Sequence, residues 1–179
     1  MISGYADGTF RPYTSTTRTQ LVKIVVLGFG LPINTPATAT FADVPPTFPF
    51  YAVIETAAAH GILSGYACGG PSEPCDGANR PYFRPYANVT RGQIAKIVVT
   101  AARWPVVPPS TPHFADVPPA HPFYALIETA AARGILSGYT CGGPGEPCDA
   151  ANRPYFRPYA DATRGQIVKI VALALAAPP

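Results

Sequence analysis

The chain has 179 residues, of which 47% are apolar and only 13% are charged, about half the usual share for a soluble domain. This length suits one domain with a substantial core, and so little charge favours a surface that neighbouring molecules cover. A net charge of +3 without a run of Lys or Arg argues against a nucleic-acid partner.

Two and a half copies of one unit follow one another along the chain. Residues 41–103 are identical to residues 114–176 at 49 of 63 positions, and residues 4–31 match only the second half of the unit. Units that recur at a fixed period bury their apolar faces against one another. Residues 1–4 enter the first copy at once, so we expect no signal peptide in this chain.

The first copy predicts one helix, which begins after Thr17. Thr17 and Gln20 have the spacing of a capping box, and apolar residues recur at helical spacing for about ten residues after it. The same Thr-x-x-Gln signature opens a helix in the other copies, at Thr90 and Gln93 and at Thr163 and Gln166.

An arginine occupies the first helical position in every copy, as Arg18, Arg91 and Arg164. A cation there is mildly unfavourable for the helix dipole, so its recurrence needs another reason. One explanation is a guanidinium that faces a ligand. The other is a salt bridge to a carboxylate of a neighbouring repeat.

The two full copies also predict an Ala-rich helix, from Pro49 to His60 and over residues 122–133. Proline suits the first helical turn, and the glycine that follows each segment suits its end. Glu55 and Glu128 lie in the middle of these helices. They resemble catalytic carboxylates, but pairing with a repeat arginine is the commoner explanation.

An extended Phe-Ala-Asp-Val-Pro-Pro segment precedes each Ala-rich helix. We expect its aspartates, Asp43 and Asp116, to hydrogen-bond the local backbone.

Four cysteines lie in two loops that the first copy lacks. The seven-residue separation and the Gly-Gly-Pro turn between them predict the disulfides Cys68–Cys75 and Cys141–Cys148. A zinc site is the competing explanation, but the cysteines are not in a Cys-x-x-Cys motif and no histidine recurs beside them, so no metal site is expected. Disulfides imply an oxidising, extracytoplasmic location.

The longest apolar stretch near the C-terminus, residues 170–177, is too short to span a bilayer. No membrane span is therefore expected.

Together these elements resemble the S-layer homology (SLH) family. Its pattern is Phe-x-Asp-Val, an Ala-rich helix, Gly-Ile-x-x-Gly-Tyr, Asp-Gly-x-Phe-x-Pro and Thr-Arg-Ala-Glu before an apolar helix. Residues 5–12 match the middle of this pattern closely. The resemblance implies an all-α fold of helix–loop–helix SLH repeats in a pseudo-threefold arrangement, with long Pro/Gly-rich loops and little or no β-structure.

The resemblance also divides the chain. It predicts a truncated repeat, a linker, a full repeat, a second linker and a second full repeat, over residues 1–31, 32–40, 41–103, 104–112 and 113–179.

Two departures from the family pattern stand out: glutamine replaces the motif's glutamate in every copy, and the cysteine loops replace the short Asp-Gly-x segment in both full copies.

The resemblance implies a non-catalytic module at the bacterial cell surface, outside the cell, that binds an envelope polysaccharide, often a pyruvylated one. It assigns ligand contacts to Arg18, Arg91 and Arg164, since a planar guanidinium grips a carboxylate bidentately. Gly65 and Gly138 would let the backbone approach the sugar. Tyr66 and Tyr139 are either stacking faces for the sugar or buried core aromatics.

An enzyme is the least supported class of function, since no nucleophile–base arrangement recurs and no catalytic residue or cofactor is expected. The alternative function is a self-assembling structural subunit, an S-layer or filament, in which a neighbouring chain completes the truncated first repeat. Such head-to-tail completion would produce a homo-oligomeric ring or an open filament.

Overall fold

A computed structural model describes residues 4–177 of the chain, and they form five α-helices without a β-strand. The helices are α1 (Arg18–Gly28), α2 (Tyr51–Ala59), α3 (Arg91–Ala101), α4 (Tyr124–Ala132) and α5 (Arg164–Ala176). Long loops connect them. The expected all-α class is therefore confirmed. The expectation about a signal peptide concerns residues 1–3, which lie outside the described part of the chain.

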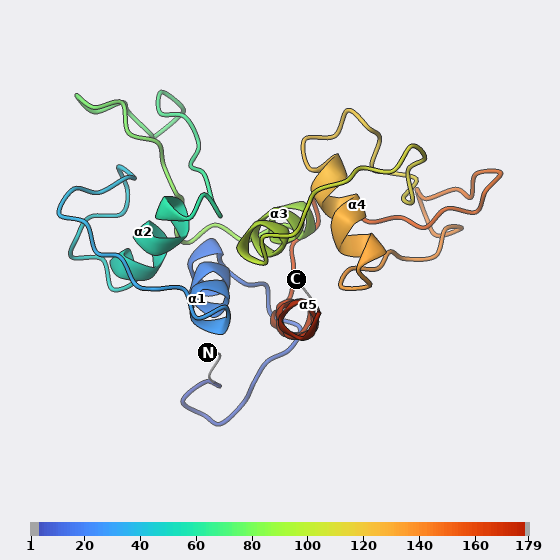
Figure 1. The fold of residues 1–179 in the computed structure, drawn as a ribbon, viewed down its shortest axis with the longest axis horizontal. Helices are drawn as coiled ribbons and strands as arrows, with labels where there is room; N and C mark the ends of the chain where they lie inside the picture. Colours follow the sequence, from blue (N-terminus) through green and yellow to red (C-terminus); the bar gives the residue numbers. More distant parts are fainter. Residues whose placement is uncertain (1–3, 178–179) are drawn as a thin grey trace.

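Three equivalent helices form the centre of the molecule. Figure 1 shows α1, α3 and α5 clustered together, with α2 beside α1 and α4 beside α3, and each of these pairs of helices is in contact. Each Ala-rich helix thus packs on the central helix that precedes it in the chain. The central helix α5 contacts only α1 and α3 among the described helices.

A ring of three backbone hydrogen bonds joins the segments that lead into the central helices. Thr16 N donates to Ala162 O (3.0 Å), Ala162 N donates to Val89 O (2.9 Å), and Val89 N donates to Thr16 O (2.9 Å). These residues are equivalent in the three copies. The half copy therefore occupies the third place in a pseudo-threefold arrangement.

The predicted capping boxes begin all three central helices. In α1, Gln20 N donates to Thr17 Oγ1 (3.3 Å) and Thr17 N donates to Gln20 Oε1 (3.0 Å). The same reciprocal pair forms between Thr90 and Gln93 and between Thr163 and Gln166. Each box satisfies two backbone N–H groups that a helix start leaves free.

The Ala-rich helices begin two residues later than predicted. The first starts at Tyr51 rather than Pro49, because a preceding turn ties Tyr51 N to Phe48 O (2.9 Å) and leaves Pro49 before the N-cap residue. Its end is as predicted: Gly61 has φ 67°, and Ile62 N donates to Ala57 O (2.9 Å). This is a Schellman motif, which needs the left-handed conformation that glycine adopts most easily.

The aspartates of the extended segments bind distant backbone, so the expectation of local hydrogen bonds is wrong. Asp43 accepts from Phe83 N (2.7 Å) and Arg84 N (2.6 Å), about forty residues further along the chain. Asp116 makes the equivalent bonds at 2.7 and 2.6 Å. Each carboxylate thus fastens the beginning of a repeat to the loop before the next central helix.

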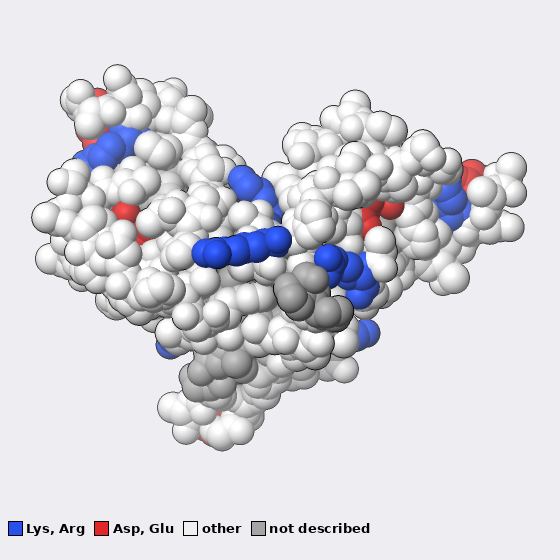
Figure 2. All heavy atoms as spheres, viewed as in Figure 1, with Lys and Arg blue, Asp and Glu red and all other residues white. Residues whose placement is uncertain are grey.

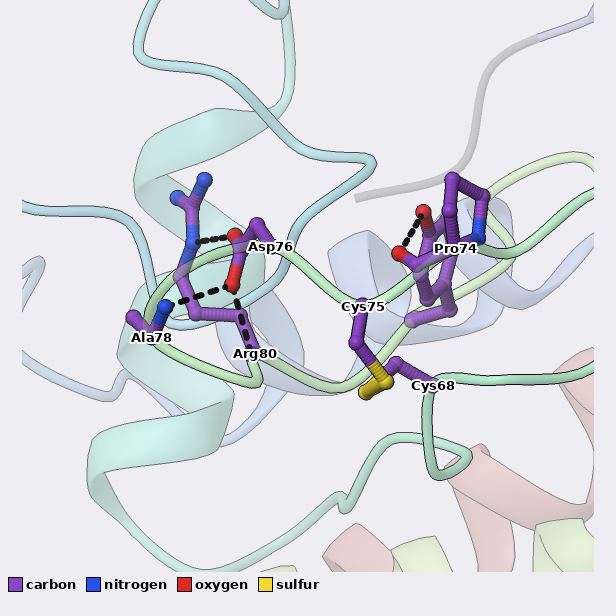
Figure 3. Close-up of a disulfide and its surroundings, with 7 residues drawn as sticks. Cys68, Pro74, Cys75, Asp76, Ala78 and Arg80 are labelled. Atoms are coloured by element: carbon purple, nitrogen blue, oxygen red, sulfur yellow. Dashed lines mark hydrogen bonds and ion pairs between the residues drawn. A yellow bond between two sulfur atoms is a disulfide. The ribbon is translucent and has the colours of Figure 1, made fainter.

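Both predicted disulfides are present, Cys68–Cys75 and Cys141–Cys148, each with a Cα–Cα distance of 4.9 Å. Figure 3 shows the first of them next to Asp76, whose carboxylate accepts from Ala78 N (3.0 Å) and pairs with Arg80 Nε (2.6 Å). Each loop is therefore closed covalently and braced by a local ion pair.

The buried glutamates do not pair with arginine, contrary to the expected explanation. Glu55 accepts from Thr40 N (2.9 Å) and Thr40 Oγ1 (2.6 Å). Glu128 accepts from His113 N (3.0 Å). These bonds hold the linker before each Ala-rich helix against that helix.

Candidate functional site

The three predicted ligand arginines join neighbouring repeats through hydrogen bonds to backbone carbonyls. Arg91 is 5% exposed, and its guanidinium donates from Nε to Phe156 O (2.7 Å) and from Nη2 to Ser137 O (2.7 Å). Arg18 repeats this with Phe83 O (2.8 Å) and Ser64 O (3.4 Å). In the third copy Arg164 Nε donates to Phe10 O (3.0 Å).

The side-chain hydrogen-bond partners of Arg18 and Arg91 are therefore backbone carbonyls, not carboxylates. Of the two explanations for an arginine at the helix start, the salt bridge is wrong for these residues. Burial lowers the pKa of both guanidiniums, although arginine stays protonated under all ordinary conditions.

Two guanidiniums lie near the ring of each of Tyr66 and Tyr139. The Arg18 Cζ is 5.1 Å from the centre of the Tyr66 ring, and the Arg84 Cζ is 3.9 Å from it. Arg91 and Arg157 hold Tyr139 in the same way, at 5.1 and 4.0 Å. Both tyrosines are half-buried rather than part of the core, and cations lie near the ring faces that a sugar would need.

The hydroxyl groups of these tyrosines bind the glutamines of the capping boxes. Gln93 Nε2 donates to Tyr66 Oη (2.8 Å), and Gln166 Nε2 donates to Tyr139 Oη (3.0 Å). The glutamine thus caps its own helix through Oε1 and binds the preceding turn through Nε2. A tyrosine hydroxyl can both accept and donate, so a carboxylate at this position could also bind it, as an acceptor.

Gly65 and Gly138 are required by packing inside each repeat. A Cβ added at Gly65 would lie 2.6 Å from Pro81 Cβ and 3.0 Å from Tyr82 O, and at Gly138 it would lie 2.9 Å from Pro154 Cβ. Both glycines also line surface hollows. Their close approach to a sugar remains a prediction.

The first of these hollows, about 100 Å³ in volume, lies between α1, α3 and the turn at residues 63–66. Its polar lining consists of Arg18, Ser64, Tyr66, Gln93 and Lys96, with no carboxylate. Lys96 Nζ donates to Ser64 Oγ (2.8 Å). Burial, and then the charge of Arg18, lower the pKa of Lys96, so two cations share this hollow.

The second hollow is the equivalent place one repeat later and has a volume of about 180 Å³. Its lining repeats the first with Arg91, Ser137, Gln166 and Lys169. The first hollow also contains Phe123, the N-cap residue of α4, whereas no Ala-rich helix packs on α5 to supply the equivalent ring. We call these two hollows the grooves.

The third copy provides part of an equivalent groove. Arg164 lies over Tyr5 (5.0 Å) and Phe10 (4.9 Å), as the other arginines lie over their tyrosines and phenylalanines. The residue equivalent to Ser64 is Ser3, which lies outside the described residues.

Lysine was not among the predicted ligand residues, although its recurrence at one position of every copy was visible in the sequence. The chain has three lysines, Lys23, Lys96 and Lys169, and all occupy the same position in the three central helices. Figure 2 shows several Lys and Arg side chains at the middle of this face, over α1, α3 and α5, and others beside Asp and Glu atoms toward the lateral parts.

In residues 4–177 no three His, Cys, Asp or Glu side chains gather closely enough to hold a metal ion. None of the five helices combines the length and hydropathy needed to cross a bilayer.

Residues 40–95 and 113–149 match the family model described as the S-layer homology domain. The two matched segments make up more than half of the chain. A search of curated proteins finds no match.

Proposed function

Because this chain belongs to the S-layer homology domain family, whose members are non-catalytic modules that anchor proteins to cell-wall polymers at the cell surface, we propose that it binds an anionic envelope polysaccharide through its grooves. The observation that carries the proposal is the charge of the groove lining. Each groove brings an arginine and a lysine together with a serine, a tyrosine and a glutamine, and no carboxylate.

The size of the grooves supports binding of one substituent or end unit of a polymer. Sites that enclose a small molecule have volumes of roughly 300–1,000 Å³, whereas these are about 100 and 180 Å³ and open to solvent. A carboxylate on a sugar, such as a pyruvyl ketal, fits such a hollow while the rest of the polymer stays outside.

The Arg91 guanidinium has more donors than its hydrogen bonds to the backbone use. A guanidinium has five N–H groups, and Arg91 uses two of them on Phe156 O and Ser137 O. Its other N–H groups donate no further hydrogen bond within the described residues, and Arg91 lines the second groove. We assign Lys169 and Gln166 as further ligand residues there, and Tyr139 as a positioning residue that holds the Arg91 guanidinium from one side.

Sedimentation with isolated envelope polysaccharide tests this function. The variant Lys96→Met/Lys169→Met should lose at least about tenfold in affinity, since a charged hydrogen bond contributes roughly 1.5–3 kcal/mol. Arg103→Met is the control, because it removes an exposed cation that does not line either groove. Retention of full affinity by the lysine variant would exclude the grooves as the binding site.

A second candidate function is self-assembly, and the exposed face of α5 favours it. Val26 of α1 and Val99 of α3 are fully buried, whereas the equivalent Ala172 of α5 is exposed, as are Leu173 and Leu175. No described helix packs on α5 as α2 packs on α1. We propose that an Ala-rich helix of a second copy covers this face and repeats the internal contact between chains.

Such a contact would be head-to-tail and would produce rings or filaments. Sedimentation velocity over a range of protein concentrations and electron microscopy measure this directly. We expect assemblies from the wild type and monomers from Ala172→Glu/Leu175→Glu. A wild-type chain that is monomeric at every concentration would rule out assembly through α5.

A further inference from the structure

A third cavity lies in the last repeat, apart from the grooves. It has a volume of about 640 Å³ and lies between the linker, α4 and the end of the second cysteine loop. Figure 1 shows the linker, the chain between α3 and α4, passing beside α4. Most of the wall is apolar, with contributions from Val107, Pro109, Pro112, Ala131, Ala132 and Pro154.

In the preceding repeat the equivalent linker is held closely to α2. Asn34 N donates to Thr56 Oγ1 (2.8 Å), and Thr40 donates from its backbone N and its Oγ1 to the two carboxylate oxygens of Glu55 (2.9 and 2.6 Å). Tyr51 Oη also donates to Pro36 O (2.8 Å). Both oxygens of Glu55 are therefore satisfied by the linker.

Two of these four bonds have no equivalent in the described part of the last repeat, where two of the linker residues concerned differ. Val107 replaces Asn34, and His113 replaces Thr40. The bonds that remain in the last repeat are His113 N to Glu128 Oε1 (3.0 Å) and Tyr124 Oη to Pro109 O (2.9 Å). The cavity lies where the hydroxyl of Thr40 and the backbone of Asn34 bind in the twin.

Glu128 is only 3% exposed and lines this cavity. Within residues 4–177 no group donates a hydrogen bond to its Oε2, the atom equivalent to the one that Thr40 Oγ1 binds in the other repeat. The cavity that Glu128 lines is open to solvent, so this oxygen can accept a hydrogen bond from an occupant that supplies a donor.

Glu128 is the carboxylate of the lining, which also contains Arg153 and His113. The Arg153 guanidinium is paired with Asp149 (Nε to Oδ2, 2.6 Å), which does not line the cavity. The carboxylate of Glu128 is thus the acceptor that the cavity offers to a cationic occupant.

We propose that this cavity binds a small organic cation, a primary ammonium group on an apolar body. The ammonium would donate to Glu128 Oε2, and the apolar body would lie against the proline and alanine side chains. A volume of about 640 Å³ falls in the usual range for small-molecule sites. This site is separate from the polysaccharide grooves and does not depend on them.

Benzylamine is a suitable probe, with benzyl alcohol as its uncharged counterpart of the same shape. We expect titration calorimetry to show one equivalent of benzylamine bound, with an affinity at least about tenfold above that of benzyl alcohol. Glu128→Gln keeps the shape and removes the charge, and should lose about the same factor. Absence of wild-type binding at millimolar benzylamine, or equal binding of the alcohol, would overturn the proposal.

The variant His113→Thr provides the matched structural control, because it restores the threonine hydroxyl that binds the second carboxylate oxygen of Glu55 in the other repeat. It should fold at least as stably as the wild type, as thermal unfolding by circular dichroism would report, and should not bind benzylamine. Undiminished binding by this variant would place the ligand elsewhere and overturn the assignment to Glu128.

Discussion

Replacing Arg91 with alanine should lower the stability of the protein, whether or not a polysaccharide is present. The change removes both side-chain hydrogen bonds of Arg91 to the last repeat and leaves Phe156 O and Ser137 O without their donor. Phe156 is fully buried, so its carbonyl cannot readily turn to water. Ser137 is exposed, and its carbonyl can.

The magnitude follows from this difference. A bond from a charged donor contributes roughly 1.5–3 kcal/mol, and the bond to Ser137 should count at the low end of that range. The free energy of unfolding should therefore fall by about 2–4 kcal/mol, which lowers the midpoint of thermal unfolding by on the order of 10 °C for a domain of this size. Arg18→Ala should cost less, because its second bond is 3.4 Å rather than 2.7 Å long.

Equilibrium unfolding in urea measures this, followed by circular dichroism and by the fluorescence of Trp104, the single buried tryptophan. Arg11→Ala is the control: its ion pair with Asp7 is about half exposed, with side-chain exposures of 50% and 48%, and should contribute at most about 1 kcal/mol. If Arg91→Ala lowers the free energy of unfolding by no more than Arg11→Ala does, the hydrogen bonds of Arg91 do not stabilise the contact between the repeats. Binding assays on arginine variants must therefore be corrected for lost stability.

Three further changes test separate parts of the structure. Thr16→Val should stabilise by about 1 kcal/mol in urea unfolding, because the fully buried Thr16 Oγ1 has no hydrogen-bond partner; destabilisation would mean that this hydroxyl is satisfied. Burial lowers the pKa of His121 below its ordinary 6.5, so the unfolded chain binds the proton more readily and stability should fall as the pH drops below about 6.5. His121→Phe, which copies Phe48 of the twin repeat, should flatten that part of the pH dependence; an unchanged slope would assign it to another group. Cys68→Ala/Cys75→Ala should cost about 2.5 kcal/mol with unchanged helix content, and a large loss of helix by circular dichroism would contradict a local role for this loop.

Local sequence chemistry predicted the elements well. The capping box at Thr17 and Gln20 and the glycine at Gly61 identify helix ends, because each acts within a few residues of the backbone that it binds. The pairing of Cys68 with Cys75 follows from a short separation around a tight turn. The start of α2 was misplaced because Pro49 fits a turn as well as a first helical position.

The interactions that join the repeats were not predictable in the same way. Arg91 binds carbonyls 46 and 65 residues further along the chain, and Asp43 binds amides about forty residues away. A charged side chain is evident in the sequence, but its partner is not, because every residue has a backbone carbonyl and nothing in the sequence singles out the one that is bound. The recurrence of the same lysine in all three copies was the signal that could have identified the groove cations.

Titration calorimetry with the envelope polysaccharide, before and after its carboxyl-bearing substituents are removed, tests the central claim most directly. The intact polymer should bind, more weakly as salt concentration rises, because a lysine and an arginine line each groove. The stripped polymer should lose at least about tenfold in affinity. Equal affinity for both polymers, without dependence on salt, would contradict recognition of an anionic group by the grooves.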